Sequence, residues 1–158
     1  MVQNIWKDGV FGLIVGDALG VPVEFSSREE CEHNPVIGMR AYGTHNQPAG
    51  TWSDDSSMTL ATLDSIKQKG KIDYKDLMDK FTEWCLYADY TPFQEVFDIG
   101  VATSRAIIQY GKGTDPIDCG GKTEWDNGNG SLMRILPVCL YLYNRQKMIC
   151  TSENESIY

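Results

Sequence analysis

The apolar residues of this chain recur at the spacing of α-helices, and no stretch alternates apolar and polar residues over the length of a strand. Weaker repeats predict helices over residues 4–16, 56–69, 93–110 and 131–143, the last kinked or divided by Pro137. The pattern therefore predicts an all-α fold. The clearest repeat lies within residues 77–88, with apolar residues at Leu77, Met78, Phe81, Trp84, Cys85 and Ala88.

Glycines at positions 12, 16 and 20 recur every four residues in and after the first predicted helix. Because glycine destabilises helices, this spacing indicates either a face that another helix approaches closely or a helix end at Gly16 or Gly20. Residues 20–52 form a long connection without helical periodicity, and such connections are usually functional or disordered. Gly70 is expected to end the helix over 56–69.

The chain has 158 residues, the size of one domain, and a net charge of −8 at pH 7. An acidic protein is not expected to bind nucleic acid or anionic membranes, and no apolar run reaches the roughly 18 residues of a transmembrane helix. Five cysteines without a C-x-x-C pair or an export signal predict reduced thiols in a cytoplasmic protein. The two histidines do not stand at zinc-ligand spacing from any cysteine, so the sequence does not predict a zinc site.

Two adjacent aspartates, Asp54 and Asp55, stand among hydroxyl side chains just before the helix predicted over 56–69. Serine and aspartate are preferred N-cap residues, so helix capping is one interpretation. Adjacent carboxylates repel each other unless a cation is bound, and carboxylate and hydroxyl oxygens suit hard cations such as Mg²⁺, Ca²⁺ and Mn²⁺. A metal site is the second interpretation, and the same residues can serve both purposes.

Two further polar clusters stand apart from this pair. In residues 16–24, Asp17 falls in the last turn of a predicted helix, where a carboxylate opposes the helix dipole and therefore requires another role. In residues 126–134, a loop with Gly128 and Gly130 precedes the helix predicted from Ser131. Such a loop exposes N–H groups to an anion such as phosphate, although a flexible turn capped by Ser131 explains the pattern equally well. A hard-cation site beside a phosphate-binding loop suits a phosphorylated or nucleotide-like ligand.

Together the three clusters resemble the ADP-ribosylglycohydrolase family. That family has a Gly-Asp-Ala-Leu-Gly segment, a Thr/Ser-Asp-Asp-Thr/Ser motif and an Asn-Gly-x-x-Met-Arg loop, which stand here at residues 16–20, 53–56 and 129–134. The order and spacing agree from Ile5 to about Leu142. The resemblance implies a compact, multi-helix orthogonal bundle that uses two magnesium ions, or manganese in some members. It also implies hydrolysis of the glycosidic bond between ADP-ribose and a protein side chain or related acceptor.

The resemblance assigns roles to individual residues. Ser53, Asp54 and Asp55 correspond to metal ligands, and Glu24 corresponds to a glutamate beside the metals. Asp98 matches an Asp-x-Gly aspartate proposed to assist catalysis, so Asp98 and Glu24 are the expected general acid and base. From spacing alone, Asp98 is also compatible with an exposed carboxylate on the polar face of a helix. The predicted substrate-binding residues, which include the cradle for the diphosphate of ADP-ribose, are Gly128, Asn129, Gly130, Ser131 and Met133.

Two departures from the family pattern affect these expectations. Val101 replaces the asparagine that usually follows the Asp-x-Gly glycine. Family members are roughly twice as long, and their second half supplies an Asp-x-Asp-Thr/Ser motif that completes the metal site. No such motif follows Arg134. We therefore expect residues 1–144 to form the N-terminal part of a single helical domain, followed by a polar tail over 145–158.

Two functions remain open from the sequence. The first is a magnesium-dependent hydrolase that acts on an ADP-ribosylated protein or an ADP-ribose-like small molecule, with action on a different glycoside as a weaker variant. The second is a catalytically inactive, truncated helical module that binds a ligand or partner. In that case Leu136, Leu140 and Leu142 are expected to be exposed and to favour association, for example with a second copy of the chain.

Overall fold

The computed structural model describes the backbone of residues 4–155 and the side chains of residues 4–146. Within that range the chain is helical, with one isolated antiparallel bridge between Tyr42 and Gln47 and no strand, which confirms the all-α prediction. The α-helices are α1 (Ile5–Gly20), α2 (Arg28–His33), α3 (Asp54–Lys69), α4 (Tyr74–Tyr87), α5 (Val101–Gly111) and α6 (Leu136–Glu155). Single-turn 3₁₀ helices are η1 (Val21–Val23), η2 (Gly43–His45), η3 (Pro116–Asp118) and η4 (Asn129–Ser131).

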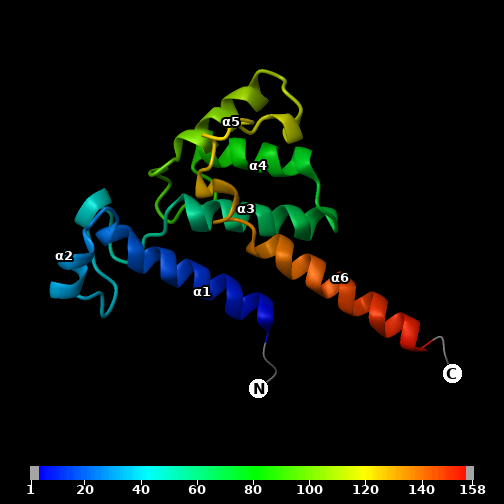
Figure 1. Ribbon diagram of the computed structural model, residues 1–158, viewed down its shortest axis with the longest axis horizontal. Helices are drawn as coiled ribbons and strands as arrows, with labels where there is room; N and C mark the ends of the chain where they lie inside the picture. The colour runs from blue at the N-terminus through cyan, green and yellow to red at the C-terminus, as the bar shows by residue number, and fades with distance from the viewer. Residues whose placement is uncertain (1–3, 156–158) are drawn as a thin grey trace.

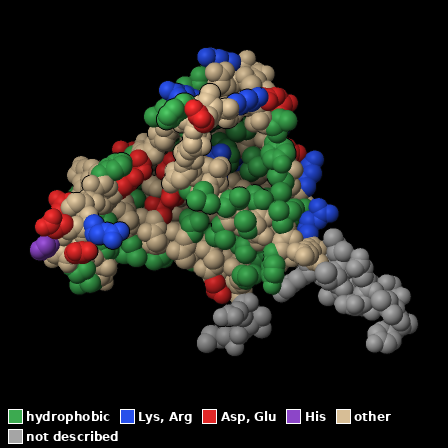
Figure 2. All heavy atoms as spheres, viewed as in Figure 1, with side chains coloured by type: hydrophobic (Ala, Val, Ile, Leu, Met, Phe, Trp, Pro, Cys, Tyr) green, Lys and Arg blue, Asp and Glu red, His purple; other side chains and the backbone are tan. Residues whose placement is uncertain are grey.

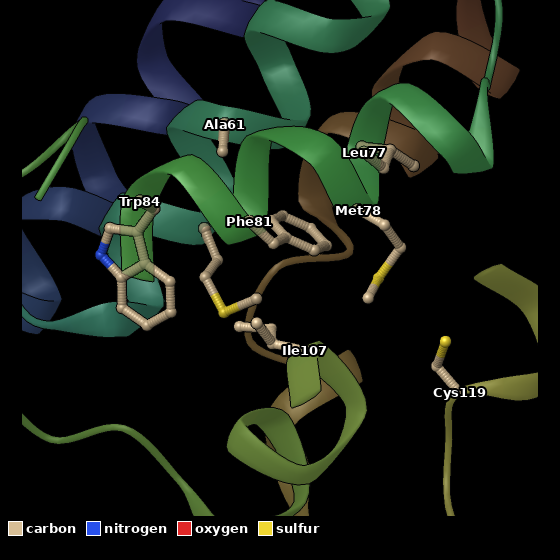
Figure 3. Close-up of a cluster of buried hydrophobic side chains, with 8 residues drawn as sticks. Ala61, Leu77, Met78, Phe81, Trp84, Ile107 and Cys119 are labelled. Carbon is tan, nitrogen blue, oxygen red and sulfur yellow. The ribbon is translucent and has the colours of Figure 1, made fainter. Parts of the chain in front are cut away.

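The core lies among α3, α4 and α5, which are stacked in Figure 1. Helix α4 contributes the apolar face predicted from its sequence, and Trp84 on that face is almost fully buried. Figure 3 shows Ile107 of α5 facing this cluster across from α4. Burial of each large side chain stabilises the fold by about 1.5–3 kcal/mol. The buried members of the cluster are Met58, Ala61, Leu77, Met78, Phe81, Trp84, Ile107 and Cys119.

Helices α1 and α6 lie on the opposite side of α3 from α4 (Figure 1). Gly9 brings them together, because a Cβ at this position would stand 3.7 Å from Leu136 and 3.9 Å from Leu140. The prediction that three leucines are exposed here is therefore wrong in part. Leu140 is buried between the helices, Leu136 is half-buried, and Leu142 alone of the three is exposed. Association of copies through this region stays a prediction.

Helix α1 runs to Gly20, so a helix end is the correct interpretation of that glycine. Within the described part of the chain, no helix packs closely on the glycine face, because no atom outside the nearby backbone of α1 lies within 4 Å of the Cβ positions of Gly12, Gly16 or Gly20. Helix α3 ends as predicted, with Gly70 in the left-handed conformation at φ 65° and its N–H donating to the Ile66 carbonyl at 2.9 Å. The local signal was thus sufficient to predict the end of α3, whereas α1 continues four residues past the predicted 4–16 range, to the second of the two glycines proposed as its end.

The helix predicted over 93–110 is wrong in its first half, since α5 begins only at Val101. Gln94 and Asp98 have φ of 56° and 57°, which an α-helix does not accommodate. The segment instead makes long-range contacts. The Phe97 ring lies 5.2 Å from the His45 ring, between centroids. Tertiary contacts therefore override the helical spacing of residues 93–100.

The helix predicted from Ser131 begins instead at Leu136, and Ser131 belongs to the separate turn η4. Pro137 consequently neither kinks nor divides α6. It occupies the first turn, where its missing N–H has no intrahelical partner to lose. Helix α6 continues to Glu155, past the boundary predicted between residues 144 and 145, and the last three residues of the expected tail lie outside the described range. The division into a domain and a tail stays a prediction.

Among the described residues, no helix combines the length and the apolar character that crossing a bilayer requires.

Candidate active site

Asp17 fixes the start of α3 from the end of α1. Its carboxylate accepts hydrogen bonds from the N and Oγ of Ser53, at 3.0 and 2.8 Å, and from the N and Oγ of Ser56, at 3.1 and 2.6 Å. Two of these donors are N–H groups of the α3 start, which otherwise lack helical partners. The role that Asp17 required in the last turn of α1 is therefore to hold the Ser-Asp-Asp-Ser segment in place.

Ser53 is the N-cap of α3, and its Oγ accepts a hydrogen bond from the Asp55 N–H at 3.3 Å. The capping interpretation is thus confirmed for Ser53. Asp54 and Asp55 form the first turn of the helix, with Asp54 buried. Burial, followed by repulsion from Asp55, Asp98 and Asp17, raises the pKa of Asp54 to about 7. Burial and the charges of Asp17 and Glu24 raise the pKa of Asp55 as well.

Glu24 and Asp98 lie close together, although they are far apart in the sequence. Burial, the charge of Glu24 and a hydrogen bond with the Glu24 side chain together raise the pKa of Asp98 to about 6. Glu24 Oε2 also lies 2.5 Å from His45 Nε2. Phe25, Asn46 and Asp98 all have left-handed φ, between 53° and 62°. Such strain in residues other than glycine gathers at functional sites.

These carboxylates face one pocket with a volume of about 850 Å³. Figure 2 shows acidic side chains gathered in a hollow of the surface. The glycine face of α1 forms one wall, and its lack of side chains keeps the pocket open beside the start of α3. The polar residues that line the pocket are Asp17, Glu24, Ser53, Asp54, Asp55, Asp98 and Asn129.

The Asn-Gly loop lies against α3, where Thr59 Oγ1 donates to the Met133 carbonyl at 3.2 Å. Asn129 and Met133 line the large pocket and also, with Gly128 and Gly130, an adjoining pocket of about 300 Å³. Ser131 is exposed and lines neither of these two pockets. Ser131 also does not act as a helix N-cap, because it lies within η4. Of the five residues predicted to bind substrate, the other four line these pockets.

Arg134, directly after this loop, supplies a positive charge beneath the carboxylates. Its guanidinium packs on the Phe81 ring at 4.7 Å from the centroid, and its Nη1 donates to Met58 Sδ at 3.5 Å. Burial lowers the Arg134 pKa, and the charge of Asp54 opposes that effect. None of the ion pairs within 4 Å in the described part of the chain involves Asp17, Asp54, Asp55 or Asp98.

The oxygen donors at the start of α3 fit a hard divalent cation. Asp54 and Asp55 lack close ion-pair partners, and burial and neighbouring carboxylates raise their pKa values. A bound divalent cation would offset this repulsion between negative charges. Sequence reasoning missed His45, because no motif includes it and its partner Glu24 stands 21 positions away. It also missed Gly100, whose backbone opposes the rise in the Asp54 pKa.

Known proteins share both this sequence pattern and this fold. The sequence model of the ADP-ribosylglycohydrolase family matches residues 4–155. The ADP-ribosylarginine hydrolase Tri1 of Pseudomonas putida is 31% identical over 138 residues, which cover 85% of this chain and 35% of that protein. The ADP-ribosyl-[dinitrogen reductase] glycohydrolase of Rhodospirillum rubrum is 33% identical over 141 residues, covering 82% of this chain and 42% of that protein.

A solved structure, described as an ADP-ribosylglycohydrolase-related protein complex, superposes with a TM-score of 0.66 at 37% identity and covers 83% of this chain and 40% of that chain. The chain thus spans about two fifths of the length of these relatives. The family match extends over nearly all of its residues. The chain therefore belongs to the ADP-ribosylglycohydrolase family.

Proposed function

We propose that this chain carries the magnesium and ADP-ribose site of an enzyme that hydrolyses the glycosidic bond between ADP-ribose and a protein side chain. The observation that carries the proposal is the convergence of Glu24, Asp54, Asp55 and Asp98 on one pocket of about 850 Å³. That volume is typical of a pocket for a small organic ligand. Membership of the family supports the reaction class, and the names of the relatives support a modified protein as the substrate.

Ser53, Asp54 and Asp55 are the residues that would hold magnesium, with manganese as the alternative ion. Their hydroxyl and carboxylate oxygens form the start of α3 and are fixed there by Asp17. When bound, a divalent cation polarises ribose oxygens and lowers the pKa of a bound water. The Asp-x-Asp-Thr/Ser motif of the family is absent after Arg134, so in this sequence these three residues are the ligands that match the family pattern.

Asp98 and Glu24 are the proposed acid–base pair. One oxygen of each carboxyl group lies within 4.8 Å of the other, and the raised pKa of Asp98 keeps part of that carboxyl protonated near neutral pH. The protonated carboxyl can donate to the departing side-chain atom, while the ionised one accepts a proton from the attacking water. His45, beside Glu24, keeps that carboxylate directed toward Asp98.

The adjoining pocket is the proposed place for the diphosphate and the nucleoside. Gly128, Asn129 and Gly130 line it, together with Arg105 and Trp125. An arginine fits the phosphate charge, and an exposed indole offers a surface for stacking a base. Asp54 and Asp126 also line this pocket, so the anionic part of the ligand would meet both positive and negative side chains there.

Release of ADP-ribose from a protein modified on arginine tests the proposal. The purified chain is expected to release ADP-ribose with Mg²⁺ and not with EDTA. Asp98→Asn should slow release by about 100-fold or more, since acid–base catalysis contributes 10²–10⁴-fold. Asp89→Asn, which removes an exposed carboxylate outside the pocket, is the matched control. Absence of release from the wild-type chain would contradict the proposal, and ADP-ribose binding without release would favour the inactive binding module.

A further inference from the structure

Three side chains from separate segments place metal-binding atoms close together at the edge of the large pocket. One imidazole nitrogen of His45 and one carboxylate oxygen each of Glu24 and Asp98 all lie within 4.8 Å of one another. We propose that these residues bind a divalent transition-metal ion of the zinc type. This site differs from the hard-cation site proposed at residues 53–55 because one of its ligands is a nitrogen.

The distances fit a single ion after small movements. Ligand atoms about 2.1 Å from a tetrahedral zinc lie about 3.4 Å from one another. The three atoms all lie within 4.8 Å, and His45 Nε2 lies 2.5 Å from Glu24 Oε2, so side-chain shifts of about 1 Å complete the set. Without an ion, His45 Nε2 lies 2.5 Å from Glu24 Oε2. A bound ion would stand between these atoms, and its charge would be balanced by the two carboxylates.

The backbone holds two of the ligands in place. Gly43 packs directly on Pro22, and a Cβ at position 43 would overlap the Pro22 carbonyl group. Thr44 Oγ1 donates to the Glu24 carbonyl at 2.6 Å, so the turn that carries His45 is attached to the residue that carries its partner. Ligands on segments that are fixed to each other lose little entropy when an ion binds.

The third ligand, Asp98, is held near His45 by the neighbouring residue Phe97. The Phe97 ring lies 5.2 Å from the His45 ring, and Asp98 follows it with a left-handed backbone. Side-chain exposure of 14% for His45 and 35% for Glu24 leaves the group accessible to an ion. Three protein ligands leave further coordination positions open to water or to a ligand oxygen, as in catalytic rather than structural zinc sites.

The donor set also selects the class of ion. Imidazole suits Zn²⁺, Ni²⁺ and Fe²⁺, whereas Mg²⁺ prefers carboxylates, carbonyls and water. The sequence did not predict this site because the partners of His45 are carboxylates 21 and 53 positions away, which no short motif connects. A bound ion would occupy both carboxylates of the proposed acid–base pair, so loading of this site should compete with that role.

The two histidines of the chain allow a direct test by long-range ¹H–¹⁵N NMR of the imidazole nitrogens. His33 is the internal control, since it lies exposed on α2 with its Nδ1 2.8 Å from the Glu29 carbonyl. Titration with Zn²⁺ at pH 7 should shift the His45 resonances until one equivalent is bound and leave those of His33 unchanged. Millimolar Mg²⁺ should not reproduce the shift. Failure of His45 to respond to Zn²⁺ overturns the proposal, whatever the outcome for magnesium or ADP-ribose.

Variants then identify the ligands. Asp98→Asn should weaken zinc binding by about tenfold or more, and asparagine tolerates the left-handed backbone at this position. His45→Ala should abolish one-to-one binding, and His33→Ala should leave it unchanged. If zinc shifts the His45 resonances of Asp98→Asn with the same affinity as in the wild type, Asp98 is not a ligand and the three-residue site is contradicted. Retained chemical-shift dispersion of the backbone amides shows that each variant is folded.

Discussion

The carboxylate of Asp17 accepts two hydrogen bonds from Ser56, 39 positions along the chain, at 3.1 Å from the backbone N and 2.6 Å from Oγ. This contact joins the end of α1 to the first turn of α3. It therefore fixes Asp54 and Asp55, which stand immediately before Ser56, relative to the glycine wall of the pocket. The geometry of the proposed metal site depends on a residue that is not itself assigned as a ligand.

Replacement of Asp17 by asparagine should therefore reduce the free energy of unfolding by about 2–3 kcal/mol. Asparagine keeps one acceptor but lacks the charge and places an NH₂ group against donors, and hydrogen bonds to charged groups contribute about 1.5–3 kcal/mol. Chemical denaturation measures the loss. Asp8→Asn removes an exposed carboxylate from the same helix and should change stability by less than about 0.5 kcal/mol. Equal effects of the two variants would show that the Asp17 contacts contribute little.

The stability of the metal-free chain should depend on pH through Asp54. Its pKa rises from 3.8 to about 7 on folding, so the folded state binds a proton that the unfolded state releases. The stability from this group is complete below about pH 4 and is lost as pH rises through 7. In EDTA, the free energy of unfolding of Asp54→Asn relative to the wild type should therefore increase by about 2–4 kcal/mol as the pH is raised from 5 to 8.

Denaturant titrations at several pH values measure that difference, with Asp89→Asn as the control for an equal change of charge. The pKa values of Asp55 and Asp98 are also raised, so the Asp54→Asn variant retains part of the pH dependence of stability. A difference between Asp54→Asn and wild type that stays constant with pH would exclude Asp54 as the source.

Magnesium should reverse the loss of stability at high pH. A cation that binds only the folded state stabilises it by about 2.7 kcal/mol at 100 times its Kd, so the melting temperature at pH 8 should rise with Mg²⁺. Asp55→Asn removes one proposed ligand and should abolish most of the rise. Sodium chloride at the same ionic strength is the control for screening. An identical rise in Asp55→Asn would place the stabilising cation at another site.

Substitution at Gly43 should separate steric overlap from backbone strain. Gly43 and Gly113 both have positive φ, but only Gly43 has a neighbour within 4 Å of the Cβ position. Gly113→Ala should lose about 1 kcal/mol through strain alone, and Gly43→Ala should lose more because the turn must move away from Pro22. The same variant should alter the His45 imidazole resonances, and Gly113→Ala should not. Equal losses in both variants would contradict close packing of η2 on η1.

Much of the helical framework could be predicted because its signals are local. The apolar spacing of α4 and the glycine after α3 depend on residues within a few positions of each other. The start of α5 could not be predicted in this way. The left-handed backbone of Asp98 and the packing of Phe97 on His45 arise from contacts with segments about 50 positions away.

The site shows the same division. Ser53, Asp54 and Asp55 are adjacent, so the sequence indicates their shared chemistry directly. Glu24 and Asp98 were identified only through resemblance to the family, since nothing in their spacing predicts that they share a hydrogen bond. Their proximity requires the turns at residues 21–24 and 43–46 and the non-helical segment before α5, none of which has a periodic pattern.

The central claim is that the carboxylate pocket of this chain binds ADP-ribose together with a divalent cation. Isothermal titration of the purified chain with ADP-ribose, in Mg²⁺ and in EDTA, measures this directly. We predict one site whose affinity falls at least tenfold in EDTA and by a similar factor in Asp54→Asn, while Asp89→Asn binds like the wild type. Binding that is unchanged by EDTA and by Asp54→Asn, or no binding in Mg²⁺, would contradict the claim.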